Sequence, residues 1–225
     1  MAGQPVQRLG KPDRTMHLLS ATSAAADVVA FLKFHMVFTS AMTGNLALFG
    51  IAIGHGHLLS ATHSLAALLG FILGIIIATL WKEHPLGLRW ILGMETGFLV
   101  IYALLWVVWR FPPEGIPLYA LIIFSAMSMG LQSVAARLIN VAGVPSVVFT
   151  NTLTSIVISF FESLRQRKPF PFALQQQFAA LLAYLFGAIL FAYFLYQIPV
   201  LAMILPAVLV FLALLSHWRS VAAGS

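Results

Sequence analysis

The residues best suited to chemistry in this chain are a few polar and charged side chains inside long apolar segments. Asp27, Lys33 and Glu95 lie in such segments, and Gln132 and Arg137 do so further along the chain. Ionisable groups at membrane depth are costly, so they usually face a cavity or a partner. We expect Asp27 to bind a proton or cation or to orient a solute, with Gln132 as its neutral counterpart. Arg137 or Lys33 would attract an anion, and Glu95 would carry a second proton.

Each of these residues also has a purely structural interpretation. Asp27 would form a buried ion pair with Lys33 or Arg137, since buried charges are normally paired. Lys33 would extend its long side chain to the membrane interface. Glu95 would lie near the interface, where Gly93 and Gly97 beside it indicate helix packing.

Two polar clusters interrupt the apolar segments at residues 38–46 and 144–154. The first contains the run Thr43-Gly44-Asn45, and the second contains Thr150-Asn151-Thr152. Ser, Thr and Asn are good caps for a helix that restarts after a break. A restarted helix directs its positive N-terminal end at whatever fills the adjacent space. The two clusters therefore predict a binding site for an anion or a polar solute, the alternative being that they cap and pack kinked helices.

Three histidines, His55, His57 and His63, form the nearest approach to a metal-binding pattern. Histidines two residues apart on a flexible loop bind zinc or copper weakly, and neither cysteine nor an acidic residue joins them. We therefore interpret them as part of an exposed polar loop and predict no metal site and no cofactor. The sequence contains no nucleophile–base set, P-loop or dinucleotide fingerprint, so an enzyme is not expected.

The composition explains what surrounds these residues. The chain has 225 residues, of which 61% are hydrophobic and 8% are charged. A soluble domain has roughly 25% charged residues, so this chain belongs in a lipid bilayer. The net charge is +6, but the basic residues do not form a stripe interleaved with aromatics, which argues against nucleic acid as a partner. Cysteine is absent, which excludes disulfides.

Six apolar regions are long enough to cross a bilayer, at about 20 residues a crossing. Two of them are overlong and contain the polar clusters. The regions run over residues 17–53, 60–81, 88–109, 116–161, 175–196 and 199–217.

Most basic residues lie at the termini and in every second connection between these regions. If each region crosses once, one side of the membrane receives Arg8, Lys11 and Arg14, then Lys82 and Arg89, then Arg165, Arg167 and Lys168, and finally Arg219. Cytoplasmic loops carry an excess of Lys and Arg, so we expect both termini in the cytoplasm. Eight crossings would move Lys82 and Arg89 outside and fit this rule less well. A cleaved signal peptide is an alternative for the N-terminus, but its apolar stretch is weak.

The chain also contains an internal similarity. Residues 66–74 read AALLGFILG, and residues 179–187 read AALLAYLFG. Each has two small residues four apart, Gly70/Gly74 and Ala183/Gly187, which allow close helix approach. With the two interrupted regions, this predicts an all-α membrane bundle of two inverted three-helix repeats, residues 16–112 and 113–218, with a discontinuous first helix in each. Residues 1–15 and 219–225 would be cytoplasmic tails.

Several of these motifs resemble one known family. Asp27, Met-Thr-Gly-Asn at residues 42–45, Met-Gly-Leu-Gln at residues 129–132 and the Thr-rich run at residues 148–153 are similar to the YoaK-like family of uncharacterised bacterial inner-membrane proteins. The similarity covers nearly the whole chain. The family usually has Thr-Gly-Thr in the second motif, where this chain has Thr150-Asn151-Thr152. The resemblance implies a six-helix inner-membrane protein suspected of transport, and it implies no substrate.

These observations predict a small secondary transporter in the bacterial inner membrane, because inverted repeats with broken helices are the plan of many such proteins. The solute, a small polar molecule or an ion, would bind between the two breaks near the bilayer midplane. A channel-like facilitator on the same fold and a non-transporting membrane scaffold or partner subunit are the alternatives. The Gly70/Gly74 pair further suggests a homodimer.

Overall fold

The computed structural model describes residues 14–109, 114–139 and 149–222, and all regular structure within these ranges is helical. Eight helices follow one another in the described residues. They are α1 (Arg14–Lys33), α2 (Met42–Gly54), α3 (Leu58–Trp81), α4 (Gly87–Trp109), α5 (Ile116–Ile139), α6 (Phe149–Gln166), α7 (Phe172–Gln197) and α8 (Pro199–Ala222).

Six of these helices are long and apolar enough to cross a membrane: α1, α3, α4, α5, α7 and α8. The shortest of the six spans has 20 residues, or about 30 Å at 1.5 Å per residue, which matches the hydrocarbon core of a bilayer. The prediction of a multi-pass all-α membrane protein is therefore confirmed.

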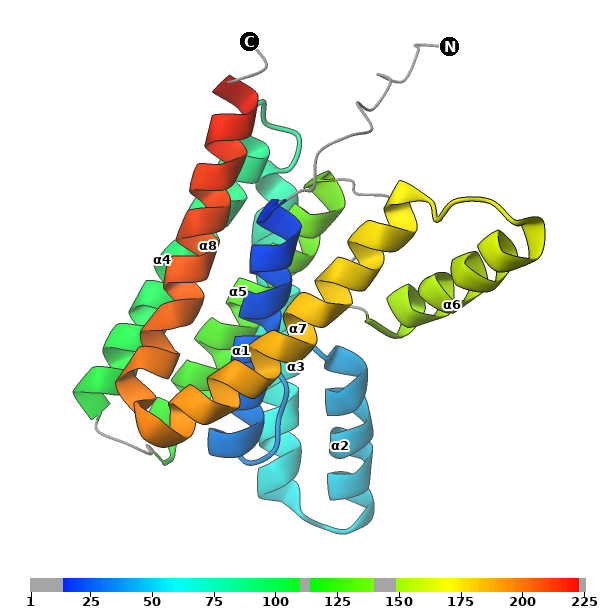
Figure 1. The fold of residues 1–225 in the computed structure, drawn as a ribbon. Helices are drawn as coiled ribbons and strands as arrows, with labels where there is room; N and C mark the ends of the chain where they lie inside the picture. The colour runs from blue at the N-terminus through cyan, green and yellow to red at the C-terminus, as the bar shows by residue number, and fades with distance from the viewer. Residues whose placement is uncertain (1–13, 110–113, 140–148, 223–225) are drawn as a thin grey trace.

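The two overlong regions each become two helices. The first divides into α1 and α2, joined by residues 34–41, and α2 begins partway along the bundle in Figure 1. His35 and Met36 turn the chain there with φ angles of 56° and 65°, which non-glycine residues rarely adopt. The second region divides into α5 and α6. The first five residues of the second polar cluster, residues 144–148, lie outside the described residues.

Helices α1 and α5 are the centre of the bundle. Helix α1 packs against α5, α7 and α8, whereas α5 packs against α1, α3 and α4. Glycines allow the closest approaches: Gly74 of α3 lies on the backbone of Met127 in α5, and Gly187 of α7 lies on Ala21 in α1. Helix α2 packs on α3, and α6 stands out from the bundle in Figure 1 with α7 as its neighbour among the described helices.

The start of α1 and the end of α8 lie at the same end of the bundle (Figure 1). The turn between α3 and α4 lies there too, because the Arg89 guanidinium is 4.7 Å from the centre of the Trp218 ring in α8. One expectation for the opposite end is wrong. His63 is not in the exposed loop with His55 and His57 but is buried inside α3, because the helix begins five residues earlier, at Leu58.

Candidate functional site at the break in the first region

The carboxyl group of Asp27 holds the segment that joins α1 to α2. Its Oδ1 accepts hydrogen bonds from the backbone N–H groups of Thr39 (2.9 Å) and Ser40 (2.8 Å). Its Oδ2 accepts from the Ser40 hydroxyl (2.5 Å) and from the Tyr184 hydroxyl of α7 (3.1 Å). Asp27 is only 3% exposed. These four donors stabilise a carboxylate in surroundings that would otherwise disfavour it.

Asn45 secures the same segment from the other side. The Phe38 N–H donates to its Oδ1 (2.9 Å), and its Nδ2 donates to the Phe38 carbonyl (2.6 Å). The amide thus occupies both backbone groups of one residue, as a neighbouring strand would. Gly44 permits this approach, because a Cβ there would lie 3.0 Å from the Phe38 ring.

The expectation that a side chain caps the restarted helix is wrong for α2. Its N-cap is Ala41, which has no capping side chain, and Thr43 is exposed in the first turn. Asn45 is used instead to bind backward to Phe38. The first polar cluster therefore fixes the shape of the connection between α1 and α2.

Gln132 joins the two central helices. It is fully buried on α5, and its Nε2 donates to the Leu19 carbonyl (2.9 Å) and to the Ser23 hydroxyl (2.7 Å) of α1. Ser23 lies one turn before Asp27, so α5, α1 and α7 are connected by polar contacts within about one helical turn. The structure thus brings Gln132, Asp27 and Asn45 into one polar region.

The described part of the second cluster, residues 149–154, is not brought to the first. Thr150 and Asn151 are exposed on α6, Thr152 is buried, and α6 packs on α7. Within the residues that the structure describes, α2 and α6 do not pack against each other. A joint role of the two clusters in binding remains a prediction.

The remaining charged candidates lie apart. Arg137 is exposed at the end of α5, and Lys33 is half-buried at the end of α1. Glu95 is fully buried among apolar residues of α4, and neither of its carboxyl oxygens has a hydrogen-bond partner in the described part of the chain. It is therefore buried inside the bundle, whereas a Cβ at Gly93 or Gly97 would meet no described atom within 4 Å, contrary to our packing interpretation of these glycines.

The histidines form a separate feature at the end of the bundle away from the termini. The His35 and His63 rings stack with centres 4.9 Å apart, and His63 also lies beside Tyr119. His35 and His57 line a small hollow of about 170 Å³ with Ser60 and Ser64. Among the described residues, no three His, Asp or Glu side chains are placed to hold a metal ion.

Sequence reasoning missed the partners of Asp27, namely Thr39, Ser40 and Tyr184. For Tyr184 a signal existed, since it corresponds to Phe71 in the two similar segments and adds a hydroxyl to an otherwise apolar pattern. For Thr39 and Ser40 the contacts depend on the path of the connection, and no spacing rule gives that path.

This arrangement can couple a protonation event to a backbone position. An ionised Asp27 accepts four hydrogen bonds, whereas a protonated carboxyl becomes a donor at one oxygen and accepts fewer. Two of these donors, the hydroxyls of Ser40 and Tyr184, share Oδ2 and come from the connection after α1 and from α7.

Comparison with known proteins gives a family and no established activity. The family described as "Protein of unknown function (DUF1275)" matches residues 15–216. The "UPF0700 transmembrane protein YoaK" of Bacillus subtilis (strain 168) is 36% identical over 186 residues, which cover 79% of this chain and 81% of the relative. No solved structure matches the chain. This transmembrane chain, with its Met-Thr-Gly-Asn motif and buried Asp27, belongs to the YoaK-like DUF1275 family of uncharacterised membrane proteins.

Proposed function

We propose that this protein is a small secondary transporter of a polar or anionic solute, with Asp27 as its coupling residue. The observation that carries the proposal is the buried Asp27 carboxyl, which joins the connection after α1 to Tyr184 of α7. A buried acid inside a spanning helix is by default a functional site. It faces the connection from the spanning helix α1 to the short helix α2, and many transporters bind substrate and ion beside such interrupted segments.

The helix contacts support an inverted-repeat plan, because they come in matched pairs. Helix α3 packs on α5 as α7 packs on α1, and α4 packs on α5 as α8 packs on α1. The glycine contacts match as well, with Gly74 on α5 and Gly187 on α1. If Met127 of α5, which Gly74 contacts, is aligned with Ala21 of α1, which Gly187 contacts, then Asp27 aligns with Ser133, the neighbour of Gln132. In this plan Asp27–Tyr184 and Gln132–Ser23 are contacts between the two repeats.

The coupling of proton binding to movement follows from the number of hydrogen bonds that the Asp27 carboxyl group can accept. Protonation of Asp27 removes acceptor capacity, so the Ser40 or Tyr184 hydroxyl must find another partner. Either change loosens the connection at residues 34–41 relative to α7. Thr43 and, on α6, Thr150 and Asn151 are exposed and available to a solute, while Asn45 keeps the shape of the site.

We further propose that both termini are cytoplasmic in a bacterial inner membrane. The basic turn at Lys82 and Arg89 lies at the same end of the bundle as the start of α1 and the end of α8. An excess of Lys and Arg on one side is typical of the cytoplasmic face. Accessibility of single cysteines is a direct test, since the chain has none of its own. Labelling of Glu83→Cys only from the periplasm would contradict this orientation.

The transport proposal is tested in liposomes that contain the purified protein. Uptake of a panel of small polar and anionic solutes is measured with and without an imposed pH gradient, for the wild type, Asp27→Asn, Tyr184→Phe and Asn45→Ala. We expect uptake of at least one solute to depend on the pH gradient in the wild type, and this dependence to be lost in Asp27→Asn. Glu162→Gln, an exposed acid on α6, is the matched control. If Asp27→Asn and Asn45→Ala leave uptake of every transported solute unchanged, the site is misplaced.

The scaffold alternative has one observation in its favour, because four protein donors already satisfy the Asp27 carboxylate. A scaffold predicts no uptake of any solute, whereas a channel predicts uptake that does not saturate and ignores every imposed ion gradient. The same liposome assay therefore separates the three functions.

The homodimer remains a prediction, but the Gly70/Gly74 pair no longer supports it. Gly70 and Gly74 pack against Ile123 and Met127 of α5 within the chain, so this pair is not available to a second subunit. The mass of the purified protein in nanodiscs tests the oligomeric state.

A further inference from the structure

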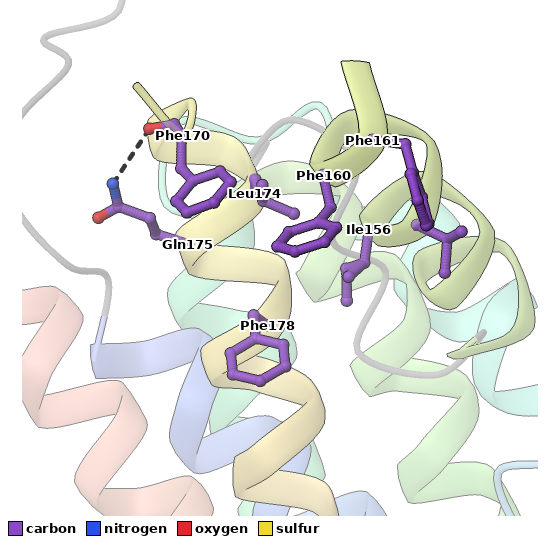
Figure 2. A pocket seen from close by; sticks show the side chains of 8 residues that line it. Ile156, Phe160, Phe161, Phe170, Leu174, Gln175 and Phe178 are labelled. Atoms are coloured by element: carbon purple, nitrogen blue, oxygen red, sulfur yellow. Dashed lines mark hydrogen bonds between the residues drawn. The ribbon is translucent and has the colours of Figure 1, made fainter. Parts of the chain in front are cut away.

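A long apolar groove separates α6 from α7 on the outside of the bundle. It has a volume of about 370 Å³. Figure 2 shows the side chains that line it, which are Ile156, Val157, Phe160, Phe161, Phe170, Leu174, Gln175 and Phe178. Its single polar side chain, Gln175, donates its amide to the Phe170 carbonyl at 3.2 Å. The groove therefore offers nothing to a polar solute.

The lining of the groove suits a hydrocarbon chain. It is apolar and aromatic and lies along α6 and the first two turns of α7. Four phenylalanines on its walls, at positions 160, 161, 170 and 178, are 40–64% exposed, so the groove is open along the outside of the bundle.

The cytoplasmic end of the groove is strongly basic. Arg165, Arg167 and Lys168 follow the lining residues of α6 and are all exposed. Helix α6 ends in a Schellman motif, in which Arg167 N–H donates to the Leu164 carbonyl (3.2 Å) and Lys168 N–H to the Ser163 carbonyl (3.0 Å).

The residue in the left-handed conformation within that motif is an arginine, which is unusual. Arg167 has a φ of 53°, whereas the equivalent position at the end of α2 is filled by Gly56 with a φ of 72°. The bonds that end α2 follow the same pattern, from Gly56 to Ile53 and from His57 to Ala52. Glycine is the ordinary residue here, since a Cβ in this conformation crowds the neighbouring carbonyl oxygen. The second repeat therefore has a cation at a position where its backbone favours glycine.

We propose that the groove between α6 and α7 binds one acyl chain of an anionic phospholipid, whose phosphate lies against Arg165, Arg167 and Lys168. The aromatic walls supply dispersion contacts that an empty groove would forfeit. The basic turn supplies charge complementary to an anionic headgroup on the cytoplasmic side, where clustered Lys and Arg commonly bind such lipids. The bound lipid connects α6 to α7, and this inference does not depend on transport.

Native mass spectrometry of the full chain tests the proposal. The protein, stripped of lipid in mild detergent, is titrated with dioleoyl phosphatidylglycerol or dioleoyl phosphatidylcholine. We expect one phosphatidylglycerol to bind with a clear preference over phosphatidylcholine. The double substitution Arg165→Gln and Arg167→Gly keeps the backbone conformation and removes two positive charges. It should weaken phosphatidylglycerol binding roughly 30-fold, which is the loss of affinity expected for removing two cations beside an anionic headgroup. Val157→Trp fills the groove from its exposed rim and should weaken both lipids.

A matched control uses two basic residues at the same end of the bundle but away from the groove. The pair Arg14→Gln and Lys82→Gln removes the same charge, and both side chains are exposed. Equal binding of the two lipids to the wild type would overturn the proposal. So would a control pair that weakens phosphatidylglycerol as much as the groove pair, or a Val157→Trp variant that binds both lipids unchanged.

Discussion

Replacement of Asp27 by alanine is the most direct test of how the break after α1 is held. The substitution leaves the Thr39 and Ser40 N–H groups buried without an acceptor, since these residues are at most 4% exposed. An unsatisfied buried donor costs about 1–3 kcal/mol, so two cost about 2–6 kcal/mol. For a chain of this size, that corresponds to a fall in Tm between about 4 and 24 °C.

Asparagine at position 27 should be far less harmful than alanine. Its amide oxygen still accepts both N–H groups, and the Ser40 hydroxyl can rotate to accept from the amide nitrogen. We expect a loss of about 1–2 kcal/mol, comparable to one charge-assisted hydrogen bond. Tyr184→Phe, which removes one donor and no volume, should fall in the same range.

The assay is thermal unfolding in detergent, followed by the intrinsic fluorescence of the five tryptophans. Hydrogen–deuterium exchange over residues 34–46 gives a local measurement and should rise in Asp27→Ala before global unfolding. Glu83→Ala is the control, because that side chain is 87% exposed and makes only a 3.7 Å ion pair with Lys82. If Asp27→Ala shifts Tm no more than Glu83→Ala, or if asparagine is as harmful as alanine, Asp27 does not hold the connection through its acceptors.

Three further substitutions and one control, Gly97→Ala, test the packing and the buried polar groups by the same Tm measurement. Gly74→Ala should destabilise by about 1–3 kcal/mol through overpacking, whereas Gly97→Ala, whose Cβ meets no atom within 4 Å, should be neutral or slightly stabilising. Equal effects would argue against the close approach of α3 and α5. Glu95→Leu should raise Tm, because it removes an unpaired buried carboxyl that costs about 1–3 kcal/mol, and a lower Tm would mean that Glu95 has a partner. Asn45→Leu should lower Tm by orphaning both backbone groups of Phe38, and wild-type stability would contradict that role.

Much of the fold could be read from the sequence, because the bilayer imposes a simple rule on composition. Spans need about 20 apolar residues, and each of the six predicted regions contains one of the long apolar helices. The interruption at residues 38–46 was also visible, since polar residues inside an apolar run signal irregular backbone. Of the second cluster the structure describes only residues 149–154, which begin α6. The helix boundaries differ from the predicted regions by a few residues. His63, which we interpreted as part of the polar loop with His55 and His57, lies in α3.

The candidate site was only partly predictable. Asp27, Asn45 and Gln132 stand out in the sequence as polar residues in apolar surroundings, and the structure brings them into one region. Their partners do not stand out, since Leu19 and Phe38 contribute backbone groups that any residue would provide.

The sequence by itself therefore determined the membrane class, the spans and the identity of the buried polar residues, because each depends on local composition alone. Only the tertiary structure decided what these residues bind. Asp27 meets Tyr184 across 157 positions of sequence, and Gly74 meets α5 instead of a second subunit. Such contacts depend on which helix faces pack against each other. The periodicity of residues along one helix does not specify which other helix its face will contact.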